Sequence, residues 1–219
     1  MLFADRIDAA RQLAGRLSHH SAARPLILAI PRGGVPIGRV IADTLGGDLD
    51  VVLVRKLGAP FNPEFAIGAI DETGAFELSP YVWQSGADRE YLEQEKAAQL
   101  ALMRERRAQY SKTLAPTDPA GRVVIVVDDG LATGATMSAA LNLVRGRKPR
   151  HLVCAIPVAA ADSLEHVTTL ADEVVAILVP DDFQAVSQFY RRFPQVDDDE
   201  VAALLAGPGK SEPMKTGPD

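Results

Sequence analysis

Five short apolar segments recur along the chain, and each is followed by a segment with the apolar spacing of a helix. They lie at residues 26–30, 50–56, 122–128, 151–158 and 173–180. Each is continuously rich in Val, Ile and Leu rather than alternating with polar residues, which is typical of strands covered on both faces. The pattern therefore predicts an α/β fold of the doubly wound kind, with a mainly parallel sheet and helices on both faces.

Two segments depart from this alternation. Residues 57–87 contain the turn residues of a loop or hairpin, and we interpret them as a flap over a site. Residues 88–110 then have the composition of a long charged helix. The last stretch, 207–219, is rich in Gly, Pro and charge with little to bury, so the sequence predicts a disordered tail.

The first 18 residues have the spacing of an amphipathic helix. We expect Ile7, Leu13 and Leu17 on its apolar side, and Arg6, Arg11 and Arg16 exposed on its solvent side. The segment has acids among its first residues and no long apolar core, which argues against a signal peptide.

Composition and charge narrow the class of protein. The 219 residues are 47% hydrophobic and 24% charged, which suits one substantial core. A net charge of −6 disfavours the basic field that nucleic-acid binding needs, and no apolar run approaches membrane-spanning length. The single cysteine, Cys154, lies in an apolar strand and excludes an intramolecular disulfide. We therefore expect a cytoplasmic protein with neither nucleic acid nor membrane as a partner.

The stretch "VVIVVDDGLATGATM" at residues 123–137 carries the clearest chemistry. Asp128 and Asp129 follow a buried strand, and ligands of open α/β sheets bind at the carboxyl ends of strands. The loop after them leads into a helix, so its backbone N–H groups and the hydroxyls of Thr133 and Thr136 predict an anion cradle. Two acids would repel a bare anion, so the ligand should also offer hydroxyls or a divalent cation. A ribose 5-phosphate meets both conditions.

The order of strand, Asp-Asp, three residues and Thr-Gly-x-Thr resembles the signature of the type I phosphoribosyltransferases, whose substrate is 5-phosphoribosyl 1-pyrophosphate (PRPP). Neither G-x-G-x-x-G nor G-x-x-x-x-G-K-[ST] occurs in the chain. The resemblance implies a 5-phosphate loop made of Gly130, Leu131, Ala132, Thr133, Gly134, Ala135 and Thr136.

Two further stretches are similar to the family's diphosphate-binding parts. "AIPRGGVPIG" places Arg32, Gly33 and Gly34 after the first strand, where glycines let the backbone approach a diphosphate and the arginine adds charge. The family often has a non-proline cis peptide in this loop, and the resemblance implies one between Arg32 and Gly33. "VVLVRKLGAP" places Arg55 and Lys56 at the end of the second strand, as in adenine and orotate members.

The base-binding parts resemble the family less completely. "VPDDFQ" is similar to a segment of the purine enzymes whose aromatic ring stacks on the base, and Phe183 is its counterpart, although a phenylalanine of the core is an alternative. Enzymes for 6-oxopurines usually carry an aspartate at the position of Ala132, and a lysine in the next strand, where "HLVCAIPV" has none. The resemblance therefore implies an enzyme that is not a typical 6-oxopurine transferase.

The resemblance also implies a mechanism, in which a base displaces pyrophosphate at the anomeric carbon. Mg²⁺ would be the cofactor, held mainly through the substrate, with Asp128 and Asp129 near it and no direct protein ligand. Arg32, Arg55 and Lys56 would neutralise the departing diphosphate and, with the two acids, form the catalytic set.

The remaining ionisable residues are interpreted as structural. Glu64 and Asp71 in the flap are candidates for catalysis, but we expect them to be exposed loop acids. The four histidines, His19, His20, His151 and His166, show no metal-ligand spacing.

In domain terms, the resemblance implies one phosphoribosyltransferase domain over residues 1–206, with a flap at 57–87 and a hood with a C-terminal helix at 180–206. It implies a pentosyltransferase acting on small molecules, PRPP or a nucleotide with a nucleobase or phosphate, and assembled as a homodimer. Two other functions use the same pocket. One is phosphorolysis of nucleoside monophosphates to ribose 1,5-bisphosphate, and the other is non-catalytic sensing of a ribosyl phosphate.

Overall fold

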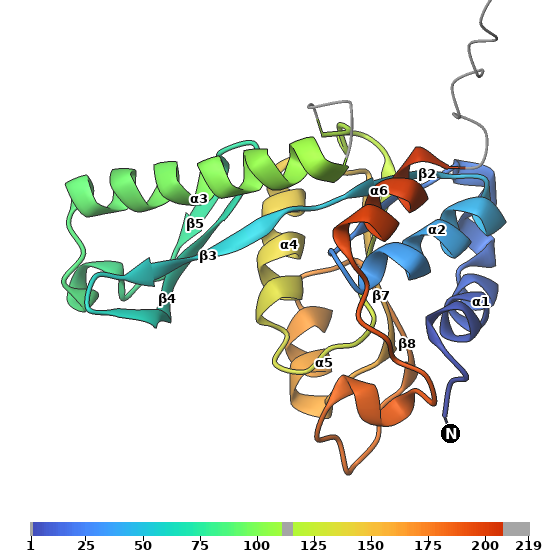
Figure 1. Cartoon of the computed structure of the whole chain (residues 1–219). Coiled ribbons are helices and arrows are strands. Elements are labelled where there is room, and N and C mark those ends of the chain that lie inside the picture. Colours follow the sequence, from blue (N-terminus) through green and yellow to red (C-terminus); the bar gives the residue numbers. More distant parts are fainter. Residues whose placement is uncertain (1, 111–115, 208–219) are drawn as a thin grey trace, which may run out of the picture.

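A five-stranded parallel sheet forms the centre of the computed structural model, which describes residues 2–110 and 116–207 (Figure 1). Its strand order is β2-β1-β6-β7-β8, and every neighbouring pair is parallel. The strands are β1 (Leu26–Ala29), β2 (Asp48–Val51), β6 (Val123–Val127), β7 (His151–Val158) and β8 (Glu173–Leu178). The predicted parallel sheet is confirmed.

Helices cover both faces of this sheet, which explains why its strands are apolar without alternation. They are α1 (Arg6–Arg16), α2 (Gly34–Leu45), α4 (Ala135–Gly146), α5 (Ala161–Thr168) and α6 (Asp198–Ala206). Ile27 and Val127 pack on the face of α1 and α2, whereas their neighbours Leu28 and Val126 pack on the face of α4 and α5. The doubly wound prediction is therefore confirmed. None of the helices in the described part of the chain is both long and apolar enough to cross a bilayer.

The apolar run at 50–56 forms two strands rather than the single strand we expected. After β2 the chain passes through the buried residues Val52 and Leu53 and enters β3 (Val54–Ala59), which belongs to a separate antiparallel sheet. The Val52 N–H still donates to Ala29 in the main sheet at 3.0 Å, and the Leu53 carbonyl accepts from Glu72 beyond it at 3.2 Å. Val51, Val52 and Leu53 are all buried across the break between the two strands, so hydrophobicity does not mark the change of sheet.

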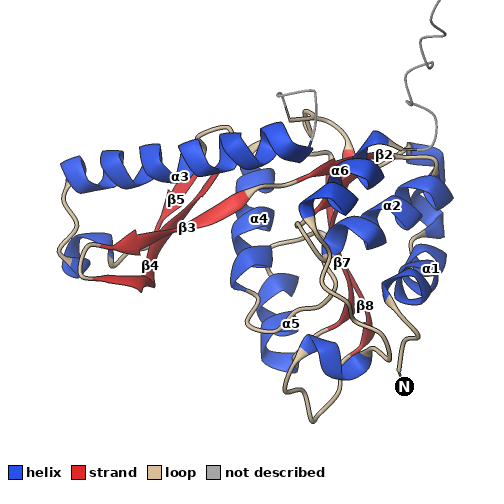
Figure 2. Ribbon diagram, viewed as in Figure 1, coloured by secondary structure: helices blue, strands red, loops and turns tan. Residues whose placement is uncertain are grey.

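The antiparallel sheet and its helix project from the main body as an arm (Figure 2). The arm consists of β3, β4 (Asn62–Asp71), β5 (Phe76–Leu78), the 3-10 helix η2 (Val82–Ser85) and α3 (Arg89–Tyr110). The hairpin expected within residues 57–87 is present. So is the long charged helix, which begins where Asp88 accepts the Tyr91 N–H at 2.8 Å. The expected tail lies outside the described residues apart from Gly207.

Asp71 is buried, which contradicts our expectation of an exposed loop acid. Asp71 is the last residue of β4. Its carboxylate accepts hydrogen bonds from the Thr73 N–H at 2.8 Å, the Thr73 hydroxyl at 2.6 Å and the Ala75 N–H at 3.1 Å. The carboxylate therefore organises the turn between β4 and β5. Glu64 lies on β4, in the strand rather than in a loop.

Arg107 joins the arm to the main sheet. Its guanidinium, 3% exposed, donates to Asp50 of β2 at 2.5 Å, to the Val51 carbonyl at 3.0 Å and to both carboxylate oxygens of Glu72. Asp50 and Glu72 are also largely buried, so one cation compensates two acids that little water reaches. The position of α3 on the main body therefore depends on this arginine.

Replacing Arg107 should loosen the arm. We expect Arg107→Met to lower the free energy of unfolding by about 3–5 kcal/mol, because both acids stay buried without their cation. Arg104→Met on the exposed side of the same helix is the matched control, with an expected change within about 0.5 kcal/mol. Urea denaturation followed by circular dichroism measures both. Equal stabilities of the two variants would contradict a joining role for Arg107.

Candidate active site

The candidate site lies where two neighbouring strands end and their connections diverge. β1 and β6 are paired in register, with Ala29 opposite Val127, but β1 continues into α2 on one face and β6 into α4 on the other. Such a switch point leaves a crevice at the carboxyl edge of the sheet. The predicted diphosphate loop after β1 and the predicted acid pair after β6 therefore flank the same crevice.

The two segments touch at Gly33 and Gly34. A Cβ atom at Gly33 would lie 2.0 Å from the Asp129 carboxylate, and one at Gly34 would lie 2.7 Å from the Val127 carbonyl oxygen. Only glycines allow this approach. The non-proline cis peptide expected in this loop is present, but it joins Pro31 to Arg32 rather than Arg32 to Gly33, which corrects its position by one residue.

Asp129 is held by Arg6, a residue that we expected in solvent. Arg6 is 8% exposed, and its Nε and Nη2 atoms donate to Asp129 Oδ2 at 2.9 and 2.8 Å. It also donates to the Pro194 carbonyl at 2.7 Å, and its guanidinium carbon lies 3.7 Å from the ring centroid of Phe193. The N-terminal helix therefore supplies a cation to the acid pair.

The spacing of α1 contained a signal for this contact. Arg6 stands four, seven and eleven positions before Ala10, Leu13 and Leu17, the repeat of one buried helix face, and all three are buried. Ile7, which we expected on that face, is instead 36% exposed. Arg6 can stay buried at the end of this apolar face because the carboxylate of Asp129 pairs with its charge.

Asp128 lacks such a cation. Burial, reinforced by the neighbouring charge of Asp129, raises the pKa of Asp128 well above its ordinary value. Among the described residues its carboxylate takes part in no ion pair, and Oδ1 accepts the Asp129 N–H at 2.8 Å. Burial also raises the pKa of Asp129, against the opposing effect of Arg6. Asp128 is thus a desolvated oxygen ligand for which hydroxyl groups or a hydrated Mg²⁺ are suitable partners.

The loop after the acids is anchored beside this carboxylate. Leu131 pairs with the end of β7, donating to Val158 at 2.8 Å and accepting from Ala160 at 2.9 Å, and the Ser163 hydroxyl donates to the Ala132 carbonyl at 2.6 Å. Gly134 then adopts a φ of 74°, a left-handed conformation that favours glycine, and caps the start of α4. The exposed hydroxyls of Thr133 and Thr136 lie at a helix N-terminus, where backbone N–H groups favour an anion.

A pocket brings three of the predicted parts together. Its lining includes Pro31 beside the diphosphate loop, Thr136 of the 5-phosphate loop, Arg55 of β3 and Met103 of α3. Arg55 is oriented by a 2.5 Å hydrogen bond from its Nε to Gln99. Lys56 is the next residue of the strand, so its side chain leaves β3 from the opposite face. The structure therefore brings Arg55, but not Lys56, to this pocket.

The segment that follows β8 covers the acid pair from another side. Its 3-10 helix η3 (Val186–Phe189) places Val186 where a Cβ on Gly130 would be 2.5 Å away, and the Tyr190 hydroxyl donates to the Asp129 carbonyl at 2.7 Å. Phe183 is partly buried and stacks on Phe189 with ring centroids 5.6 Å apart. Tyr190 was not predicted from the sequence, since its partner is a backbone oxygen that no side-chain motif marks.

Loss of Arg6 should destabilise the fold, because Asp129 would stay buried without its cation. We expect Arg6→Met to lower the free energy of unfolding by about 3 kcal/mol. Arg11→Met, on the exposed side of the same helix, should change it by less than about 0.5 kcal/mol. Chemical denaturation of both variants is the measurement. A stability of Arg6→Met equal to that of Arg11→Met would show that Asp129 does not need this partner.

The chain is similar to a known protein family along most of its length. A family model described as the phosphoribosyl transferase domain matches residues 3–193. A Mycobacterium tuberculosis protein of strain CDC 1551, MT0597, provisionally named a phosphoribosyl transferase, is 41% identical over 205 residues, which cover 93% of this chain and 46% of that protein. Rv0571c of strain H37Rv matches to the same extent. This chain thus spans about half the length of these curated relatives.

A solved structure shows the same fold along nearly the whole chain. The crystal structure of TT1426 from Thermus thermophilus has a TM-score of 0.84 and 46% identity to this chain, and the match covers 94% of this chain and 98% of that one. The residues that the family model matches include both loops, the acid pair and Arg6. The chain belongs to the type I phosphoribosyltransferase family.

Proposed function

We propose that the chain is a phosphoribosyltransferase that uses Mg²⁺ and PRPP and transfers the phosphoribosyl group to or from a nucleobase. One observation carries the proposal. At the switch point between β1 and β6, the glycine loop, the carboxylate of Asp128 and the anion cradle of α4 lie together, and Arg55 lines a neighbouring pocket with Pro31 and Thr136. A ligand with a phosphate, vicinal hydroxyls and a diphosphate would use all four.

Each part of PRPP has a partner in this arrangement. The 5-phosphate suits the start of α4, with Thr133 and Thr136 as donors. The ribose hydroxyls suit Asp128, which has no cation of its own in the described residues. The diphosphate suits the loop of Arg32, whose glycines permit close approach of the backbone, and the guanidinium of Arg55.

The same residues support cleavage of the bond between the anomeric carbon and the diphosphate oxygen. As this bond breaks, positive charge develops on the ribose ring, and the Asp128 carboxylate stabilises it by accepting hydrogen bonds from the ribose hydroxyls. Arg32 and Arg55 offset the negative charge that collects on the leaving diphosphate. When bound, Mg²⁺ would add a further positive charge at the diphosphate oxygens.

The acceptor is proposed to be a base other than a 6-oxopurine. Ala132 offers a methyl group, and its carbonyl already accepts from Ser163, so no side chain at this position can take a proton from a base. Phe183 stacks on Phe189 and remains partly exposed, which leaves ring surface for a base. Stacking on a flat face accepts several ring systems.

Binding of PRPP is the first test of the proposal. Calorimetry with Mg²⁺ present should show heat for PRPP, and Arg55→Ala should weaken that binding by about tenfold or more, because one charge-assisted contact to the diphosphate is lost. Ribose 5-phosphate, which lacks the diphosphate, should bind equally well to both proteins. Arg104→Ala on α3 is the control cation. Absence of PRPP binding by folded protein would refute the proposed function, and equal losses for both ligands would remove Arg55 from the diphosphate.

Asp128→Asn should separate activity from stability. The amide should abolish most turnover, because the charge beside the ribose is lost. A carboxyl whose folded pKa lies above its unfolded value costs stability once the pH exceeds the unfolded pKa, so the variant should be more stable by about 1 kcal/mol at neutral pH.

Turnover is measured with a panel of bases plus PRPP, and with nucleoside monophosphates plus phosphate or pyrophosphate. Selective use of guanine or hypoxanthine by the unaltered protein would contradict the proposed acceptor class. Release of ribose 1,5-bisphosphate would favour phosphorolysis. Full turnover by Asp128→Asn would contradict the role of this acid.

A further inference from the structure

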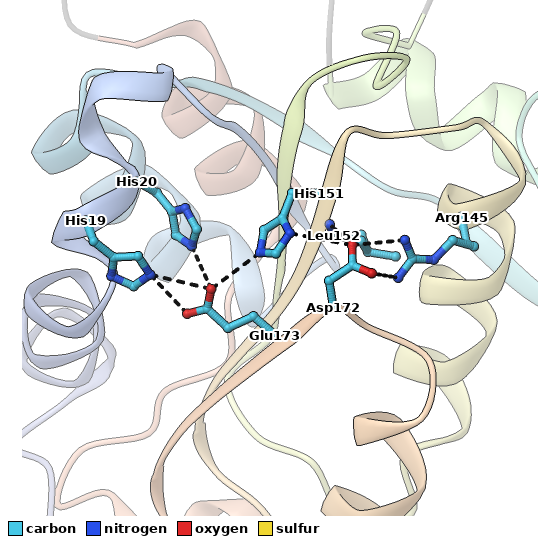
Figure 3. A network of polar contacts seen from close by, with 7 residues as sticks. All are labelled: His19, His20, Arg145, His151, Leu152, Asp172 and Glu173. Carbon is cyan, nitrogen blue, oxygen red and sulfur yellow. Dashed lines mark hydrogen bonds and ion pairs between the residues drawn. The ribbon is translucent and has the colours of Figure 1, made fainter.

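Three histidines converge on one carboxylate at the amino-terminal ends of the strands β7 and β8 (Figure 3). Glu173 Oε2 lies 3.0 Å from His20 Nε2 and 3.5 Å from His151 Nε2, and Glu173 Oε1 lies 3.1 Å from His19 Nε2. In each ring it is the same nitrogen that faces Glu173. These four side chains, which we name the histidine cluster, take no part in the chemistry proposed above.

The main-chain positions of the cluster fix it at the amino ends of strands. His151 is the first residue of β7 and Glu173 the first of β8, whereas Asp128 follows the carboxyl end of β6. His19 and His20 lie in the 3-10 helix η1 (Ser18–Ala23), directly after α1. The cluster therefore joins the segment after α1 to two neighbouring strands of the sheet.

The spacing of the donor atoms suits a shared ion. One ligand atom each from His19, His20 and Glu173 lie within 4.8 Å of one another. Two ligands bound about 2.0–2.1 Å from a tetrahedral Zn²⁺ are about 3.4 Å apart, close to the separations from Glu173 to the three ring nitrogens. His151 Nε2, 3.5 Å from Glu173 Oε2, lies outside this group of three, so a fourth ligand requires the His151 ring to move toward the other atoms.

The surroundings resemble the outer shell of a metal site. Asp172 Oδ2 lies 3.7 Å from His151 Nδ1, on the side of the ring away from Glu173. Asp172 is itself fixed by Arg145, at 2.8 and 3.0 Å, and by the Leu152 N–H at 2.7 Å. A carboxylate behind a ligating imidazole holds the ring in the orientation that presents its other nitrogen.

We propose that the histidine cluster binds one Zn²⁺ ion, with His19, His20, His151 and Glu173 as its ligands. Three imidazole nitrogens and one carboxylate oxygen are typical ligands of Zn²⁺ and unlike the all-oxygen set that Mg²⁺ prefers. Four protein ligands leave no open position, so the role is structural. The ion fastens the segment after α1 to β7 and β8. Side-chain exposure of 55% at His19 gives the ion a path to the cluster.

The test is a titration of metal-stripped protein with Zn²⁺, followed by calorimetry and by thermal unfolding. The unaltered protein should bind one equivalent, and its melting temperature should rise with Zn²⁺ concentration. His19→Ala combined with Glu173→Gln should weaken binding by more than about 100-fold, since even residues behind the ligands contribute 10–100-fold. His166→Ala removes the one remaining histidine of the chain, on the exposed surface of α5, and should bind Zn²⁺ normally.

The outcomes separate this site from the proposed active site. Mg²⁺ in excess should not displace Zn²⁺, and Mg²⁺ alone should not raise the melting temperature as Zn²⁺ does. If the double variant does not fold, His19→Ala alone serves, because its side chain is exposed. Unaltered Zn²⁺ affinity in the variants, or no binding beyond that explained by His166, would overturn the proposal and leave a hydrogen-bonded cluster. Neither result depends on binding of PRPP.

Discussion

Two adjacent, partly buried carboxylates at the end of β6 are the constraint on which the rest of the molecule depends. Desolvation penalises both charges, and the protein compensates Asp129 with a single cation, Arg6. That cation comes from the first helix, and its other contacts are Pro194 and Phe193 near the opposite end of the described chain. The first helix and the segment at 193–194 must therefore meet at the carboxyl ends of the strands.

The two acids differ in their partners, because Arg6 pairs with Asp129 and not with Asp128. Asp129 is occupied by Arg6 through its side chain and by Tyr190 through its backbone, so it holds the covering segments in place. Asp128 takes part in no ion pair among the described residues. A similar division applies to the pocket, whose walls come from two bodies: Pro31 and Thr136 belong to the main sheet, and Arg55 belongs to the arm that Arg107 fixes in position. The geometry of the site thus depends on ion pairs outside it.

The sequence patterns predicted the elements whose residues are contiguous in the chain. The sheet followed from continuous apolar runs because both of its faces are covered, and the acid pair and glycine loops are contiguous in sequence. The division of the run at 50–56 did not follow, since Val52 and Leu53 are as apolar as the strands beside them. Arg6 was misplaced because its partner is 123 positions away. His19 and Glu173 are 154 positions apart, and only the strand order brings them together.

Two of the hydrophobic clusters are built from different parts of the chain, and this has a consequence for synthesis. The core beneath α4 and α5 is built from residues between Leu26 and Ala176, so all of its parts precede the segment at 189–190 in the chain. The cluster around Phe3 and Ala9 instead needs Phe189 and Tyr190. Until those residues emerge, the first turns of the chain keep an uncovered apolar surface that a nascent-chain chaperone would recognise. Phe3 and Ala9 precede the core beneath α4 and α5 in the chain, yet they can be covered only after the residues of that core have been made.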